Sequence, residues 1–155
     1  MTVQQQRHSV AADSLYDRDI IAWANEQARL LRAGQLNRID IEHIAEEIED
    51  VGKSEQREFA SRMAVLLGHL LKWQYQPVRR GASSEKTIKA QRKELAYNLK
   101  ETPSLRVKLK DPDWLDMVWA RAVALAVTET GLDCFPDTCA WSRDDEVLAP
   151  SWLPE

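Results

Sequence analysis

The stretch HLLKWQYQP, residues 69–77, holds the densest group of side chains that could bind a ligand. It places an imidazole and two aromatic rings with polar tips where an apolar run meets a proline. With a carboxylate from the acidic stretch 45–50, they define a candidate polar pocket lined by Glu46, His69, Trp73 and Tyr75. In a second interpretation His69 is a core residue, hydrogen-bonded to a carboxylate of that stretch or to Tyr75.

The same acidic stretch offers ion pairs to the basic residues that follow the proline. Glu47 is adjacent to Glu46, and Arg79 and Arg80 come directly after the apolar run ends. Guanidinium groups bind carboxylates through short, charge-assisted hydrogen bonds. We therefore expect charge contacts among Glu47, Arg79 and Arg80.

Carboxylates and an imidazole on helices also raise the possibility of a metal centre. Glu42, Glu46 and Glu49 share one helical face. Ferritin-like bundles, however, use Glu-x-x-His motifs, and the residue three before His69 is Leu66. We assign no metal ligand and no cofactor, and we keep a metal-binding helical bundle as the second alternative to our main functional hypothesis.

Nothing in the sequence matches a known catalytic motif. There is no nucleophile elbow, no glycine-rich phosphate loop and no cysteine in a catalytic signature. We assign no catalytic residue, and the sequence favours a non-enzymatic protein.

Charge is divided unevenly along the chain. Lys and Arg number 8 against 12 Asp and Glu in residues 1–71, 11 against 3 in 72–110, and 2 against 10 in 111–155. A basic segment with interleaved aromatic residues can neutralise phosphates and stack bases. The candidate nucleic-acid face consists of Lys86, Lys89, Arg92 and Lys93. The acidic balance of the whole chain, −4, favours instead a basic helix that contacts acidic ones within the monomer or across a homodimer.

The elements that would position these residues are all helical. The spacing predicts one helix over 14–34, capped by Ser14 or Asp17 and ended by Gly34. It predicts a second over 41–51, capped by Asp40 and ended by Gly52. A third should run from Ser54 to about Tyr75, and its apolar surface on all sides predicts a central position.

The second half of the chain also contains residues that typically begin and end helices. A polar helix after Gly81 should lie on the surface and contact the core through Ile88, Leu95 and Leu99, followed by a short turn that carries Leu105 and Leu109. Asp111 and Pro112 begin a helix that Gly131 ends, and Ser142 caps a final turn before Pro150.

These patterns predict an all-α, single-domain bundle of about six helices, with a central buried helix around residues 54–74. The domain should span residues 14–154, after a disordered tail over 1–13. The chain has no apolar run long enough to span a bilayer and no signal peptide, so we expect a cytoplasmic protein without a membrane partner. Cys134 and Cys139 should be reduced thiols, with Cys139 buried.

Motifs in order along Ser14 to Pro154 resemble one known family. They are SLYDRDIIAWANEQARLLRAG, IAEEIEDVGKSE, HLLKWQYQP, TIKAQR, TPSLR, ETGL and WLP. The chain resembles the bacterial domain of unknown function 29 family, which implies an all-helical fold but no reaction, cofactor or catalytic residue. The sequence departs from the family pattern at His43, Ser84 and Ala140, where asparagine, tryptophan and proline are common.

The leading functional hypothesis is a cytoplasmic, non-enzymatic helical interaction domain that binds a protein partner or a second copy of itself. Six tryptophans, some of them expected at the surface, support binding. The first alternative is nucleic-acid binding through residues 72–110.

Overall fold

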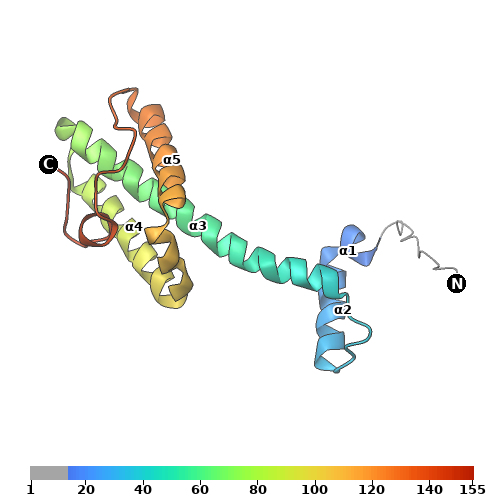
Figure 1. Ribbon diagram of the computed structural model, residues 1–155. Helices are drawn as coiled ribbons and strands as arrows, with labels where there is room; N and C mark the ends of the chain where they lie inside the picture. The colour runs from blue at the N-terminus through green and yellow to red at the C-terminus, as the bar shows by residue number, and fades with distance from the viewer. Residues whose placement is uncertain (1–13) are drawn as a thin grey trace, which may run out of the picture. The chain divides into compact units, whose positions relative to one another are not determined.

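The computed structural model describes residues 14–155, so the predicted tail over 1–13 lies outside the described residues. All regular structure in the described part is helical, which confirms the all-α prediction (Figure 1). The main helices are α1 (Leu15–Arg18), α2 (Ile20–Arg32), α3 (Ile41–Tyr75), α4 (Ala82–Glu101) and α5 (Pro112–Thr130). Three short helical segments are η1 (Pro77–Arg79), η2 (Pro103–Lys110) and η3 (Arg143–Val147).

Contacts group the chain into two compact units, one that ends at Gly52 and one that comprises Lys53–Glu155. Helix α3 contributes residues to both. The division into compact units does not test whether residues 14–154 form a single domain, which stays a prediction.

The first helical pattern is divided in two, so the prediction of one helix over 14–34 was wrong. Asp19 adopts an extended conformation, and its carboxylate accepts a hydrogen bond from the backbone N–H of Ala22, 3.0 Å away. It therefore caps α2 and ends α1. Ser14 caps α1, and Gly34, with a φ of 70°, follows the end of α2 as predicted.

Helix α3 runs through Gly52, so the predicted end there and the new start at Ser54 were also wrong. A glycine in a helix interior costs about 1 kcal/mol relative to alanine, but it ends a helix only when the backbone turns left-handed. Gly52 keeps a helical conformation. The predicted cap at Asp40 and the predicted exit at Tyr75, before Pro77, are confirmed.

The core of the second unit surrounds the later part of α3, as predicted for the segment 54–74. Phe59, Met63, Leu66 and Leu70 are fully buried, and α4 and α5 lie alongside them (Figure 1). Helix α4 contributes Ile88, Leu95 and Leu99 to this core and exposes most of its other residues, as its sparse apolar pattern predicted. Buried side chains of η2 and η3 complete it: Leu105, Leu109 and Val147.

Helix α5 begins and ends where the sequence predicted. The carboxylate of Asp111 accepts hydrogen bonds from the N–H groups of Asp113 and Trp114, and Gly131 has a φ of 70°. Gly68 of α3 lies close to α5: a Cβ built at Gly68 would be 3.5 Å from the carbonyl oxygen of Ala122. Within residues 14–155, no helix is both long enough and apolar enough to cross a membrane.

Candidate interaction surfaces

A polar and aromatic cluster centred on Asp40 holds the first unit together. The Oδ2 atom of Asp40 lies 2.6 Å from Nδ1 of His43 and accepts a hydrogen bond from Nε1 of Trp23 at 3.0 Å. The backbone N–H of Asp40 donates to Oε1 of Gln27 at 2.7 Å. One carboxylate thus connects α2 to the start of α3.

Tyr16 closes the cluster from α1. Its ring stacks on His43 with centroids 3.8 Å apart, and its hydroxyl donates to Oε1 of Glu47 at 2.7 Å. That hydrogen bond, followed by partial burial and the carboxylate charge, raises the pKa of Tyr16 to about 12. The cluster could not be predicted from the sequence because its members are distant in the chain, although Tyr16 and Trp23 are two helical turns apart.

Hydrogen bonding sets the charges within the cluster. The bond to Asp40 raises the pKa of His43 above its ordinary value. Partial burial raises the pKa of Asp40, but the hydrogen bonds from His43 and Trp23 outweigh it and leave the pKa lowered. Both shifts favour the charged form of the group concerned, the imidazolium of His43 and the carboxylate of Asp40.

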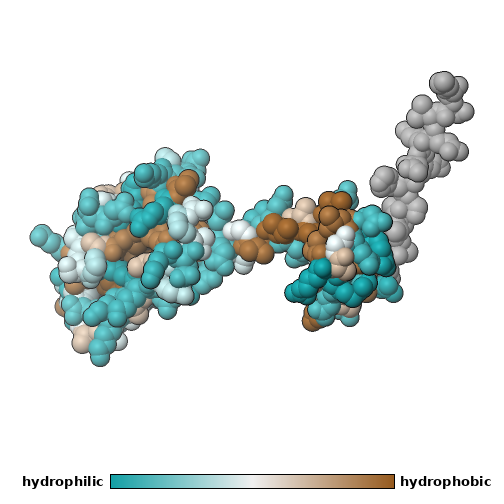
Figure 2. All heavy atoms as spheres, turned by 90° about the horizontal axis from the view of Figure 1, so that it is seen from below, coloured by the Kyte–Doolittle hydropathy of each residue, from teal (hydrophilic) through white to brown (hydrophobic). Residues whose placement is uncertain are grey.

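The first unit buries few apolar side chains. In its described part, residues 14–52, the buried hydrophobic residues are Trp23 and Leu30. A row along the first turns of α3, which we name the isoleucine stripe, consists of Ile41, Ile44, Ile48 and Val51. Ile41, Ile48 and Val51 are 67%, 67% and 66% exposed, and hydrophobic residues gather at the surface of this unit (Figure 2). Apolar patches of this kind mark interaction sites more often than isolated exposed residues do.

The surroundings of the isoleucine stripe are strongly acidic. Residues 39–52 contain no lysine or arginine. Their carboxylates are Asp40, Glu42, Glu46, Glu47, Glu49 and Asp50. The predicted site residues Glu46 and Glu47 belong here; Glu46 is exposed, and Glu47 is bonded to Tyr16.

The second unit carries a groove of opposite charge, which we name the Trp114 groove. It has a volume of about 520 Å³, and its apolar floor is Ala60, Trp114 and Met117. The basic residues around it are Lys53, Arg57, Lys108 and Arg121, and the acidic ones are Asp111 and Asp113. Trp114 stacks on Phe59 with centroids 5.5 Å apart, and its buried Nε1–H has no hydrogen-bond acceptor among the described residues. This groove could not be predicted from the sequence, because its residues come from α3, η2 and α5.

His69 and Trp73 do line a common pocket, with a volume of about 600 Å³. The carboxylate in this pocket is Glu129 of α5, which forms a salt bridge with Lys72. Burial, followed by the charge of Lys72, lowers the pKa of His69. Of the two other residues predicted there, Tyr75 packs edge-on against Phe135, and Glu46 belongs to the first unit.

The two arginines after Pro77 have separate roles. Arg80 donates from Nε to the carbonyl oxygen of Trp73 at 2.8 Å, and its guanidinium lies 5.5 Å from the centre of the Trp73 ring. Arg80 therefore caps the negative end of α3, where a cation is favoured. Arg79 lines the His69 pocket. The expected ion pairs with Glu47 would join residues of different units, and they stay a prediction.

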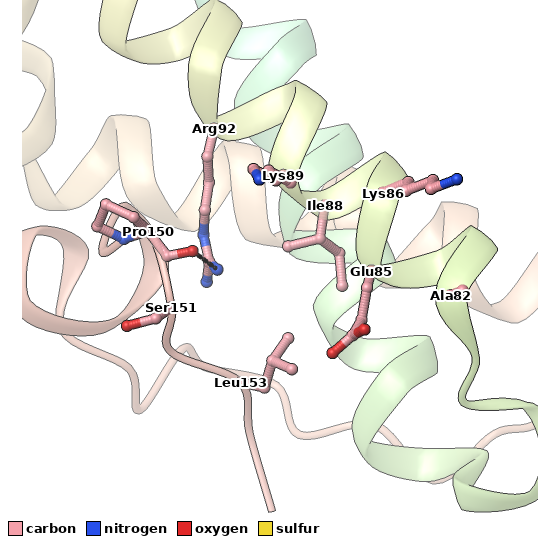
Figure 3. Close-up of a pocket in the computed structure, with 9 residues that line it drawn as sticks. All are labelled: Ala82, Glu85, Lys86, Ile88, Lys89, Arg92, Pro150, Ser151 and Leu153. Carbon is pink, nitrogen blue, oxygen red and sulfur yellow. Dashed lines mark hydrogen bonds between the residues drawn. The ribbon is translucent and has the colours of Figure 1, made fainter.

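Arg92 is not part of a nucleic-acid face, which corrects the prediction made from its charge. Its side chain is 6% exposed and points from α4 into the C-terminal segment (Figure 3). Nε donates to the carbonyl oxygen of Val147 at 2.9 Å, and Nη2 donates to that of Trp152 at 2.7 Å. Burial lowers the pKa of Arg92, but its donors are matched by backbone acceptors. Lys86, Lys89 and Lys93 remain exposed.

No group of three or more His, Cys, Asp or Glu residues within the described range 14–155 is arranged to hold a metal ion. Both cysteines are free thiols. Cys134 is exposed, and burial raises the pKa of the partly buried Cys139.

The described residues form an all-α protein. Residues 14–52 are acidic and bury few apolar side chains, whereas Lys53–Glu155 enclose a well-packed core. The model of the family described as domain of unknown function DUF29 matches residues 15–153, and the chain belongs to this family. The resemblance seen in the motifs is thereby confirmed. No curated protein and no solved structure matches the chain.

Proposed function

We propose that the protein is a helical interaction domain that binds a protein partner through the isoleucine stripe. The observation that carries this proposal is the exposure of Ile41, Ile48 and Val51, about two thirds each, on a helix that the chain keeps continuous through Gly52. Burying such side chains against a partner removes apolar surface from water, which favours association.

The way the first unit is held together supports this role. In its described residues, 14–52, hydrogen bonds and ring stacking around Asp40, His43 and Tyr16 accompany a small apolar core, whose buried side chains are Trp23 and Leu30. The isoleucine side chains are therefore available to a partner without disturbing the contacts that position α3. A preformed surface binds with a smaller entropic cost than one that must first be ordered.

The proposal gives no role to a catalytic residue, a cofactor or a metal. It places the protein in the bacterial cytoplasm, where the free thiols of Cys134 and Cys139 would stay reduced.

A photoreactive phenylalanine analogue introduced at Ile48 tests the proposal in a bacterial host. The matched control carries the same analogue at Val78, which is 96% exposed in η1 of the second unit. We expect protein adducts from position 48 and few from position 78. Equal labelling from both positions, or none from position 48, would contradict the proposed function.

A second candidate function is nucleic-acid binding through α4, favoured by one observation. Lys86, Lys89 and Lys93 are exposed, and their spacing puts them on one helical face. Three phosphate contacts would make the logarithm of the binding constant fall with the logarithm of salt concentration with a slope of roughly 3. Titration of RNA and DNA duplexes at low ionic strength, with a Lys86→Gln/Lys89→Gln/Lys93→Gln variant as control, tests it.

A further inference from the structure

We infer that the isoleucine stripe of one copy of this protein docks in the Trp114 groove of a second copy. The inference rests on the proposed function and names the partner that the stripe contacts. The two surfaces belong to the same chain, the stripe to the first unit and the groove to the second.

The apolar parts of the two surfaces are complementary. The stripe is a single row of aliphatic side chains at helical steps of three, four and three. The groove offers an apolar floor in which Met117 is 39% exposed and Trp114 is 6% exposed. A helix that lays an apolar row into an apolar groove is a recurring mode of protein recognition.

The charges of the two surfaces are complementary as well. The stripe lies in a segment of 14 residues, 39–52, with six carboxylates and no lysine or arginine. Four basic residues surround the groove, against Asp111 and Asp113. The basic residues outnumber the acidic ones, so the groove presents a positive rim overall. Opposite potentials across an interface steer the encounter and disfavour other pairings.

Charge also decides against the obvious alternative, in which two stripes pack on each other. That arrangement would bring two acidic segments together, and like charges across an interface are unfavourable. Docking into the groove pairs the acidic segment with Arg57, Lys108 and Arg121 instead.

The contact should be modest in size. The stripe covers three turns of one helix, about 16 Å long and 10 Å wide, which is small beside the roughly 800 Å² that each partner buries in a standard interface. We therefore expect a reversible, salt-sensitive association with a dissociation constant on the order of micromolar.

Two variants separate the two surfaces. Ile48→Asn/Val51→Asn alters the stripe, and Met117→Asn/Arg121→Glu alters the groove. All four positions are exposed, so each variant should fold, and circular dichroism checks this. Val78→Asn, at an exposed apolar side chain outside both surfaces, is the matched control.

Sedimentation velocity of the full chain over a range of concentrations tests the inference. We expect wild type and Val78→Asn to self-associate, and the stripe and groove variants each to associate at least tenfold more weakly. A mixture of the two variants should form a one-to-one heterodimer, because one intact stripe then meets one intact groove.

Two results would overturn the inference: a wild-type chain that stays monomeric at all concentrations, or a variant mixture that does not associate. Protein adducts at position 48 that map to a different protein, together with a monomeric chain, would leave the proposed function standing and remove only the second copy as partner. A monomeric chain without adducts at position 48 would remove both.

Discussion

Nη2 of Arg92 lies 2.7 Å from the carbonyl oxygen of Trp152, so a buried arginine of α4 holds the end of the chain against the core. The same guanidinium bonds the carbonyl oxygen of Val147 in η3. Without these donors, two backbone carbonyls would lose their partners, and each buried unsatisfied polar group costs about 1–3 kcal/mol.

Replacing Arg92 should therefore destabilise the second unit. We expect Arg92→Met to lower the free energy of unfolding by about 2–4 kcal/mol, measured by urea denaturation. The neighbouring exposed Lys93→Met is the matched control and should change stability by less than about 0.5 kcal/mol. Equal stability of the two variants would show that Arg92 does not hold the C-terminal segment.

The pKa values of the two described histidines, His43 and His69, should depart in opposite directions from the ordinary value of 6.5. The hydrogen bond to Asp40 raises the pKa of His43, whereas burial and then Lys72 lower that of His69. Proton NMR of the imidazole resonances, assigned with His43→Gln and His69→Gln, should show His43 losing its proton at the higher pH. The reverse order would contradict the Asp40 cluster.

The raised pKa of His43 also predicts how the first unit responds to pH. Because the folded state binds the proton more tightly than the unfolded chain, this stabilisation is fully present below about pH 6.5 and is lost as pH rises through the raised pKa. Asp40→Asn should remove this pH dependence, whereas Tyr16→Phe, which keeps the ring stacked on His43, should retain it. Hydrogen exchange of the amides in residues 20–47, followed between pH 5.5 and 8.5 with correction for the intrinsic rate, measures it.

Gly68 should tolerate a methyl group but not a longer side chain. A Cβ there would make ordinary contacts with the carbonyl oxygen of Ala122, at 3.5 Å, and Cβ of Leu125, at 3.7 Å. Gly68→Ala should therefore be neutral or stabilising, and Gly68→Leu should destabilise by about 1–3 kcal/mol through overpacking. Thermal unfolding compares them; equal stability of the alanine and leucine variants would contradict the close approach of α3 and α5.

Substitution of Gly52 should have a different effect on stability, because a side chain at this helical position would face open space. Gly52→Ala should stabilise α3 by up to about 1 kcal/mol through helix propensity and slow amide exchange around it. If α3 instead ended at Gly52, alanine would gain no such stability. Hydrogen exchange of peptides covering residues 45–60 distinguishes the two.

The ends of helices could be predicted from the sequence where a single residue determines the backbone conformation. Pro77 and Gly131 ended α3 and α5 as predicted, because a proline or a left-handed glycine acts without help from distant residues. The same rules failed at Asp19 and Gly52. Asp19 can stand inside a helix or cap one, and Gly52 can end a helix or lie within it, and periodicity does not separate these choices.

The candidate sites depended on contacts between distant parts of the chain, which a single sequence does not reveal. Arg92 carries the same charge as Lys93, yet it is buried because the carbonyl groups of residues 146–152 fold over it. Trp73 and His69 lie in one pocket because they are one helical turn apart, but their carboxylate neighbour, Glu129, comes from α5.

Hydrogen exchange, followed by mass spectrometry as the protein is concentrated, tests the central claim most directly without any substitution. If the isoleucine stripe is a protein-binding surface that docks in the Trp114 groove, added protection should appear in peptides that cover residues 41–52 and 108–121. Protection confined to other segments, such as residues 82–101 of α4, or a segment 41–52 that exchanges equally fast at every concentration while the protein associates, would contradict the claim.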